Sequence, residues 1–157
     1  MKKLIKYIIV FALLASLGFS LFYKIKNQKA VYAAINPNNA SDLQLIARAI
    51  NGEARGESYE GQVAVGAVIL NRVKSSKFPN TISGVIYQAG AFTAVSDGQI
   101  NVPIDEKSTV VKAAQDALNG WDPTGGAIYY FNPNTATSSW IWSRPQIKTI
   151  GSHIFCK

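Results

Sequence analysis

The order of patterns along the sequence predicts an α+β fold, mainly helical, that forms a single domain with a small C-terminal β-sheet. Between residues 42 and 118, apolar side chains recur at helical spacing in several stretches. After Gly125-Gly126 the chain becomes rich in β-branched and aromatic residues, which is typical of strands. An apolar fraction of 48% over 157 residues suffices for the core of one such domain, preceded by an apolar N-terminal helix.

The N-terminal segment, residues 1–33, has the pattern of a signal peptide or a membrane anchor. A basic stretch precedes 17 uncharged residues, Tyr7–Tyr23, rich in Ile, Leu, Val and Phe. Small residues permit cleavage after Ala33, but the apolar run is long for a signal peptide and lysines follow it, so cleavage and retention both stay open. Either alternative predicts an exported domain that works outside the cytoplasmic membrane. Residues 34–40, rich in turn-forming residues, are expected to be a linker.

The positive charge of the chain is concentrated in this leader. The net charge is +7, of which +6 comes from the lysines of residues 1–29, where no acidic residue occurs. Ten basic and nine acidic side chains remain in residues 30–157, which leaves +1. A nearly neutral domain gives no electrostatic indication of nucleic-acid binding, so no nucleic-acid partner is expected.

The first two helices of the domain are expected at residues 42–51 and 61–73. Ser41 or Asp42 can cap the first helix, and Gly52 is expected to interrupt it. Its apolar positions follow the i, i+3, i+4, i+7 pattern: Leu43, Ile46, Ala47 and Ile50. In the second segment, glycines and alanines between aliphatic residues permit close packing against the first helix.

A short helical turn is expected at residues 83–88 and a third long helix at 106–118. Between them, residues 92–100 are mixed, with a turn indicated by S-D-G. The third helix has small apolar residues on one face: Val110, Ala113, Ala114 and Ala117. Asn119-Gly120 provides its C-terminal cap.

The expected strands follow in the last thirty or so residues. A-I-Y-Y-F at 127–131 is β-branched and aromatic. Residues 135–144 hold two tryptophans two positions apart, which fits a strand or an extended edge with both rings on one face. Residues 147–155 are expected to form a last pair of short strands around Gly151.

The scarcity of histidine and cysteine excludes several reaction classes. With His153 and Cys156 as the only residues of their types, neither a zinc hydrolase site nor an intrachain disulfide can be built, and no metal or cofactor is expected. No G-x-S-x-G or phosphate-binding glycine motif occurs. Carboxylate chemistry on a nearly neutral, aromatic-rich domain remains, a combination typical of glycoside cleavage.

Two carboxylates stand four residues apart in N-G-E-A-R-G-E, at the end of the first expected helix. Glu53 and Glu57 can be read as a solvated helix face, and the spacing alone favours that interpretation. Alternatively, Glu53 is a partly desolvated general acid, since burial of a carboxyl group favours the protonated form that such chemistry requires.

Six stretches carry a resemblance to a known family. They are A-R-A-I-N-G-E-A-R-G-E at 47–57, G-Q-V-A-V-G-A-V-I-L-N-R-V at 61–73, F-P-N-T-I-S-G-V-I-Y-Q at 78–88, F-T-A-V-S-D-G-Q-I at 92–100, A-L-N-G-W-D-P-T-G-G-A-I-Y-Y-F-N-P at 117–133 and W-I-W-S-R-P-Q-I-K-T-I-G-S-H-I-F at 140–155. Together they resemble the catalytic domain of cell-wall hydrolases of the spore cortex-lytic (SleB/CwlJ) type. They follow one another in order along nearly all of the exported domain, residues 41–157, so the resemblance is specific.

The resemblance implies a lysozyme-like fold and cleavage of the peptidoglycan glycan strand between N-acetylmuramic acid and N-acetylglucosamine. In the lytic transglycosylase chemistry that it implies, one glutamic acid protonates the leaving oxygen and the muramyl 6-hydroxyl closes a 1,6-anhydro ring. Glu53 matches the first acid of the family motif and is therefore expected to be catalytic. Some members carry a separate peptidoglycan-binding repeat domain where this chain has only leader and linker. The expected setting is the spore cortex, which carries muramic-δ-lactam, during germination, and general turnover of the vegetative wall stays open as the alternative.

Substrate contacts are expected from six further residues: Glu57, Phe92, Thr93, Tyr130, Asn132 and Trp142. Each has a structural alternative. Glu57 either orients Glu53 or contacts substrate, or is a surface acid, and Phe92 is as readily a core residue. Burial is at least as common for a tryptophan as a sugar platform. His153 is expected to be structural.

Two classes of function follow. The first is an exported glycan-strand lytic enzyme that acts through Glu53, with peptidoglycan as substrate, the membrane as a partner of the N-terminal segment and an unidentified protein that restrains it. The second is a non-catalytic, membrane-tethered wall-binding domain. The intact motif around Glu53 favours the enzyme, and a zinc amidase ranks third because its ligands are missing.

Overall fold

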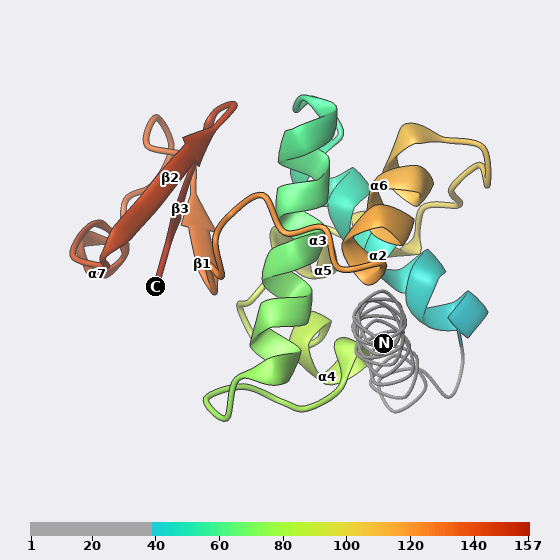
Figure 1. Cartoon of the computed structure of the whole chain (residues 1–157), viewed down its shortest axis with the longest axis horizontal. Coiled ribbons are helices and arrows are strands. Elements are labelled where there is room, and N and C mark those ends of the chain that lie inside the picture. Colours follow the sequence, from blue (N-terminus) through green and yellow to red (C-terminus); the bar gives the residue numbers. More distant parts are fainter. Residues whose placement is uncertain (1–38) are drawn as a thin grey trace, which may run out of the picture. The chain divides into compact units, whose positions relative to one another are not determined.

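The computed structural model describes residues 39–157 (Figure 1). The predicted leader with its apolar helix, residues 1–33, and most of the predicted linker lie outside the described residues. Within residues 39–157, no helix has the length and apolar character that crossing a membrane requires.

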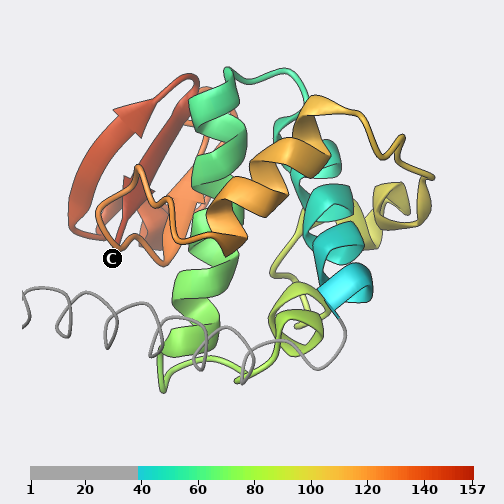
Figure 2. The ribbon, with the colours of Figure 1, turned by 45° about the vertical axis from the view of Figure 1, so that its right-hand side comes forward.

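Three long helices make up most of the described domain: α2 (Asn39–Ala54), α3 (Tyr59–Lys74) and α6 (Thr109–Leu118). Helix α3 lies between the β-sheet on one side and α2 and α6 on the other (Figures 1 and 2). A helix in this position needs apolar side chains around its whole circumference. Residues 61–70 of α3 are accordingly all buried, with Gln62 as the one polar residue among them.

The predicted helices are largely confirmed. Ser58 begins α3 by accepting a hydrogen bond from the Gly61 N–H at 3.2 Å. The turn expected at 83–88 is α4 (Ile82–Ile86), and the mixed segment forms α5 (Thr93–Ser96) and the 3-10 helix η1 (Gln99–Asn101). Helix α6 begins three residues later than expected, and its predicted face is buried: Val110, Ala113, Ala114 and Ala117. Asn119 and Gly120 follow it as predicted, with Gly120 at φ 97°.

The prediction that Gly52 interrupts the first helix is wrong. Helix α2 begins at Asn39, before the predicted caps, and continues through Gly52 to Ala54. A Cβ atom at position 52 would collide with the Cβ of Ala94 in α5. The missing side chain therefore lets α5 approach the last turn of α2, which outweighs the modest cost of glycine inside a helix. This close approach positions the carboxyl group of the next residue.

The sheet consists of three short antiparallel strands: β1 (Tyr129–Phe131), β2 (Gln146–Ile150) and β3 (His153–Cys156). Their order is β1-β3-β2, so the last strand of the chain lies in the middle. The predicted strands at 127–131 and around Gly151 are confirmed, and Gly151 forms the β2–β3 turn at φ 58°. Phe155 of β3 is fully buried against α3, in a cluster with Ala64, Val68, Ala127 and Ile150.

The strand or extended edge expected at 135–144 is wrong. Residues Ser139–Trp142 form one helical turn, α7, with Ile141 buried and the flanking tryptophans exposed. Trp140 packs edge-on against Tyr129 of β1, with ring centroids 5.1 Å apart. Trp142 packs against Phe131 at 4.8 Å. The two rings thus contact different residues of β1. These contacts stabilise a helical turn in a segment where the alternation of apolar residues indicated a strand.

Candidate active site

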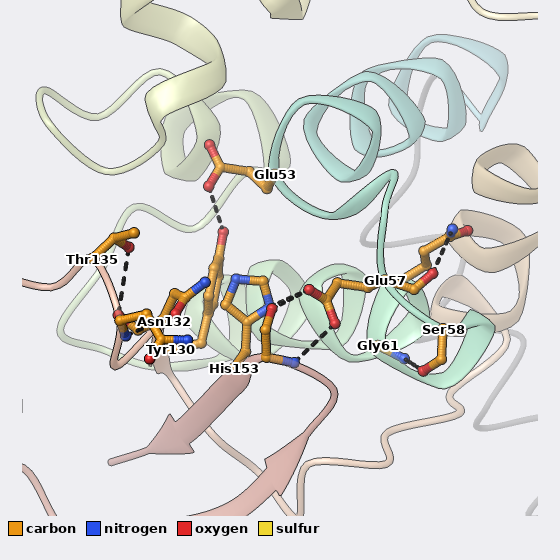
Figure 3. A network of polar contacts seen from close by, with 11 residues as sticks. Glu53, Glu57, Ser58, Gly61, Tyr130, Asn132, Thr135 and His153 are labelled. Carbon is orange, nitrogen blue, oxygen red and sulfur yellow. Dashed lines mark hydrogen bonds and ion pairs between the residues drawn. The ribbon is translucent and has the colours of Figure 1, made fainter.

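The carboxyl group of Glu53, in the last turn of α2, is fixed by two donors from other elements. The backbone N–H of Ala94 in α5 donates to Oε1 at 2.8 Å, and the Tyr130 hydroxyl of β1 donates to Oε2 at 3.0 Å. Figure 3 shows Tyr130 reaching from the sheet toward Glu53. Glu53 is therefore an oriented acid in the interior of a site and does not belong to a solvated helix face.

The phenol of Tyr130 is a dependable donor to this carboxyl group. Burial raises the pKa of Tyr130 well above its ordinary value, and the neighbouring Glu53 adds to the effect. The strand that carries Tyr130 is itself anchored, since Arg72 Nε of α3 donates to the carbonyl of Ile128 at 2.7 Å. The guanidinium of Arg72 also lies over the ring of Tyr129, 5.6 Å from its centroid. These contacts hold β1 in the position from which the hydroxyl of Tyr130 reaches the carboxyl group of Glu53.

A pocket of about 300 Å³ opens beside Glu53. One wall comes from the loop before α5 and from Thr93. The opposite wall comes from β1 and the segment after it, including Tyr130, Asn132 and Thr135, and His153 of β3 completes the lining. A concave site with one oriented carboxyl group and several hydroxyl and amide groups suits a polar, hydroxyl-rich ligand.

Four of the predicted site residues meet at this pocket: Glu53, Thr93, Tyr130 and Asn132. Asn132 Oδ1 accepts the N–H of Asn134 at 2.9 Å and so stabilises the turn after β1. Within the described residues, the side-chain amide nitrogen of Asn132 donates to no protein group, which leaves it available to a ligand. Thr93 is exposed at the pocket edge.

Phe92 and Trp142 lie outside the pocket lining. Phe92 is only 4% exposed and lies under the guanidinium of Arg72, 5.2 Å from its ring centroid, which is the environment of a core residue. Trp142 is 44% exposed and packs on Phe131, a residue of the pocket wall, so its free face lies beyond the pocket.

Glu57 does not point toward Glu53. The chain leaves α2 after Ala54, and the Glu57 carboxylate turns to the β2–β3 turn, where the backbone N–H of Ser152 donates to Oε2 at 3.0 Å. The hydroxyl of Ser152 donates to Oε1. This hydroxyl hydrogen bond holds the pKa of Glu57 below its ordinary value, against the opposing effect of burial. Gly151 suits this turn, because its φ of 58° favours glycine and because a Cβ at this position would displace the Glu57 carboxylate.

His153 is the site residue that the sequence reasoning assigned to structure. It is 8% exposed, and its ring meets that of Tyr130 edge-on at 5.2 Å. Burial lowers the pKa of its imidazole below the ordinary value, and the carboxylates of Glu57 and Glu53 oppose this shift. A signal was present in the sequence, since His153 alternates with the buried Phe155 and must share its side of the strand.

Comparison with known proteins places the chain in a family. Residues 56–156 match the family model described as Cell Wall Hydrolase. The chain belongs to the cell wall hydrolase family. Glu53 lies three residues before the first matched residue.

Two solved structures of this family share the fold. The catalytic domain of the Bacillus cereus SleB protein is 68% identical, with a TM-score of 0.69, and the match covers 74% of this chain and 89% of that one. The catalytic domain of the germination-specific lytic transglycosylase SleB from Bacillus anthracis is 67% identical, with a TM-score of 0.70 and coverage of 74% and 93%. The resemblance and the predicted mainly helical α+β fold with a small sheet are thereby confirmed.

Another similar protein is the spore cortex-lytic enzyme of Bacillus cereus. It is 66% identical over 122 residues, which are 78% of this chain and 46% of the relative. The chain therefore spans less than half the length of that relative.

Proposed function

We propose that this chain is an exported peptidoglycan lytic enzyme that cleaves the glycan strand between N-acetylmuramic acid and N-acetylglucosamine, with Glu53 as general acid. The observation that carries the proposal is the Glu53 carboxyl group, held by Ala94 and Tyr130 in the wall of a pocket. The names of the relatives support the substrate class, because the Bacillus cereus protein is called a spore cortex-lytic enzyme.

In the proposed reaction, protonated Glu53 gives its proton to the glycosidic oxygen while the bond from that oxygen to the anomeric carbon breaks. The product of this transfer is a carboxylate with two acceptor oxygens. The N–H of Ala94 and the hydroxyl of Tyr130 each donate to one of them, at 2.8 and 3.0 Å. Hydrogen bonds to a charged acceptor are the stronger kind, so these donors stabilise the enzyme in the state after proton transfer.

The attacking group in this proposal is the 6-hydroxyl of the muramyl residue, which yields a 1,6-anhydro end. The Bacillus anthracis relative is named a lytic transglycosylase, and this name supports transglycosylation over attack by water. One oriented acid is sufficient for such a reaction, because no enzyme carboxylate has to act as the nucleophile.

The sugar contacts in this proposal come from the polar lining of the pocket. The amide of Asn132 and the hydroxyl of Thr93 meet sugar hydroxyl or acetamido groups, and Trp142 offers its exposed face to a ring bound beyond Phe131. Tyr130 acts mainly through Glu53. Residues 1–33 would export or tether the chain, so that it meets peptidoglycan in the spore cortex or the wall.

Mass spectrometry of muropeptides tests the proposal. Vegetative wall and δ-lactam-containing cortex are each digested with the full chain and with Glu53→Gln as the variant without an acidic proton. Products with 1,6-anhydro ends, one water lighter than reducing ends, are expected from the unmodified chain alone. Reducing ends would replace transglycosylation by hydrolysis. No cleavage of either wall by folded protein would favour a wall-binding domain.

A further inference from the structure

Beside the acid Glu53, the pocket contains a second titratable group that the proposed reaction has not yet used. His153 lines the pocket from β3, on the strand next to Tyr130. Its side chain is 10% exposed, and the side chain of Glu57 next to it is 15% exposed. A buried imidazole at the wall of a polar pocket is a common choice for proton transfer near neutral pH.

The two ring nitrogens of His153 have different surroundings. Nδ1 is buried, forms no hydrogen bond within the described residues, and lies 3.8 Å from Oε1 of Glu57. That side of the ring therefore faces Glu57, and Figure 3 shows His153 between Tyr130 and Glu57. With Nδ1 directed to a carboxylate, the proton of the neutral ring belongs on Nδ1, which leaves the lone pair of Nε2 for a ligand.

Glu57 is held independently of His153. Its two oxygens accept the backbone N–H and the hydroxyl of Ser152, so the carboxylate keeps its place whether or not the ring is charged. At 3.8 Å the contact with a neutral ring is weak, and it strengthens when the ring becomes an imidazolium. The fixed carboxylate of Glu57 therefore stabilises the imidazolium form of His153 more than the neutral form.

We propose that His153 is a second catalytic residue of the pocket, a base that accepts the proton of the attacking hydroxyl group, and that Glu57 is its positioning residue. The inference rests on the proposed function, because it requires Glu53 as the acid of the same reaction. The two acids of N-G-E-A-R-G-E then serve one pocket from two sides, Glu53 directly and Glu57 through the imidazole.

The proposed step balances its atoms and protons. The hydroxyl oxygen forms a bond to the anomeric carbon, and its proton passes to Nε2 of His153. The bond from the anomeric carbon to the leaving oxygen breaks, and that oxygen takes the proton of Glu53. The enzyme is left with a carboxylate and an imidazolium, and a proton returns from His153 to Glu53 through the solvent of the pocket.

The charge state of the ring suits this task. Burial lowers the pKa of His153, so the resting imidazole is neutral and able to accept a proton. The titratable groups that face the ring are Glu53 of α2, Glu57 of the α2–α3 connection and Tyr130 of β1. The carboxylates raise the pKa of His153 and Tyr130 stays neutral, so removal of the charge of Glu57 must lower it. Activity is lost as the pH falls through the pKa of His153.

The first experiment measures this titration directly. His153 is the only histidine of the chain, so in a preparation without a histidine tag its imidazole NMR signals need no assignment. The titration midpoint is compared among the unmodified full chain, Glu57→Gln and the control Glu60→Gln, which removes an exposed acid paired with Lys148 on the surface. The midpoint is expected to fall in Glu57→Gln alone. An unchanged midpoint in Glu57→Gln would overturn the positioning role.

The second experiment measures cleavage of soluble glycan-strand oligosaccharides as a function of pH. His153→Gln is expected to lower kcat about a hundredfold, with little change in KM and without the acid limb of the profile. Glu57→Gln is expected to lower kcat about tenfold and to move the acid limb to lower pH. If His153→Gln does not fold, the test rests on the pH–rate profile of Glu57→Gln. An acid limb at the same pH as in the unmodified chain would overturn the proposal.

The outcomes separate this inference from the proposed function. Unchanged kcat and an unchanged acid limb in folded His153→Gln, together with an inactive Glu53→Gln, would refute the base and leave the acid in place. An active Glu53→Gln would refute the proposed function itself.

Discussion

Glu53 and Glu57 belong to one short motif, and the fold gives their carboxyl groups different surroundings. Glu53 faces the pocket, where Tyr130 and Ala94 each donate to one of its oxygens. Glu57 turns to the β2–β3 turn, where Ser152 supplies both donors. The helix ends between the two residues, so the i, i+4 relation never places them on one face. Two identical side chains are thus held in different places, because each receives its partners from a different element.

The largest effect expected from this comparison is that of Glu53→Gln. The amide keeps the shape of the side chain but has no acidic proton, so cleavage should fall about a thousandfold or more. Glu57→Gln should lose much less, and Glu60→Gln should match the unmodified chain. The rates of muropeptide release from purified wall check this order. Equal losses in Glu53→Gln and Glu57→Gln would mean that the two acids act as a coupled pair.

Tyr130→Phe removes one of the two hydrogen-bond donors to Glu53 and keeps the aromatic ring. A hydrogen bond to a charged group contributes about 1.5–3 kcal/mol, so kcat should fall about ten- to a hundredfold. The packing of the ring against Phe155, with centroids 5.8 Å apart, should preserve the thermal stability. Steady-state kinetics and thermal unfolding of the same preparation check both. A kcat that does not change would show that the phenol contributes nothing to the acid.

Gly52→Ala tests the close approach of α5 to the end of α2. The added methyl group meets the Cβ of Ala94 and should separate the Ala94 N–H from Glu53. Overpacking of this kind costs about 1–3 kcal/mol of unfolding free energy. Gly56→Ala is the matched control, because nothing lies within 4 Å of a Cβ at that position. Urea unfolding and cleavage rates are measured for both variants. Equal stability and equal rates in Gly52→Ala and Gly56→Ala would contradict tight packing at position 52.

Ser152→Ala acts on the Glu57 side alone. The Ser152 hydroxyl lowers the pKa of Glu57 in the folded protein, so this contribution to stability is present above the ordinary pKa of a glutamic acid. It is lost as the pH falls through the lowered value in the folded protein. Ser152→Ala should therefore unfold at lower urea concentration at pH 7, and its stability should fall less between pH 7 and pH 3. If Ser152→Ala lowered the urea midpoint by the same amount at pH 7 and at pH 3, the loss of stability would not come from the pKa of Glu57.

Trp142→Ala should have the smallest effect. Its free face lies beyond the pocket wall, so loss of a sugar platform should raise KM a few-fold at unchanged kcat, roughly the effect of one stacking contact. Trp121→Ala is the control, because Trp121 is equally exposed at 44% and packs against Tyr59, away from the pocket lining. Identical KM values in both variants would remove Trp142 from the substrate site.

The sequence by itself determined the elements whose signals are local. Helical periodicity and the Asn-Gly pair after α6 depend on neighbours within about four residues, and these predictions are confirmed. The family followed from contiguous motifs in the same way, and so did the choice of Glu53 as the candidate acid.

Only the tertiary structure decided how the site is assembled. Tyr130 reaches Glu53 across 77 positions, and Ser152 reaches Glu57 across 95. The errors at Gly52 and at α7 have the same origin, since Ala94 and the β1 aromatic rings are remote in sequence. A contact between distant segments depends on how whole elements pack, and a local pattern carries no record of it. The place of the His153 ring between Tyr130 and Glu57, on which its proposed role rests, likewise depends on how β3 packs.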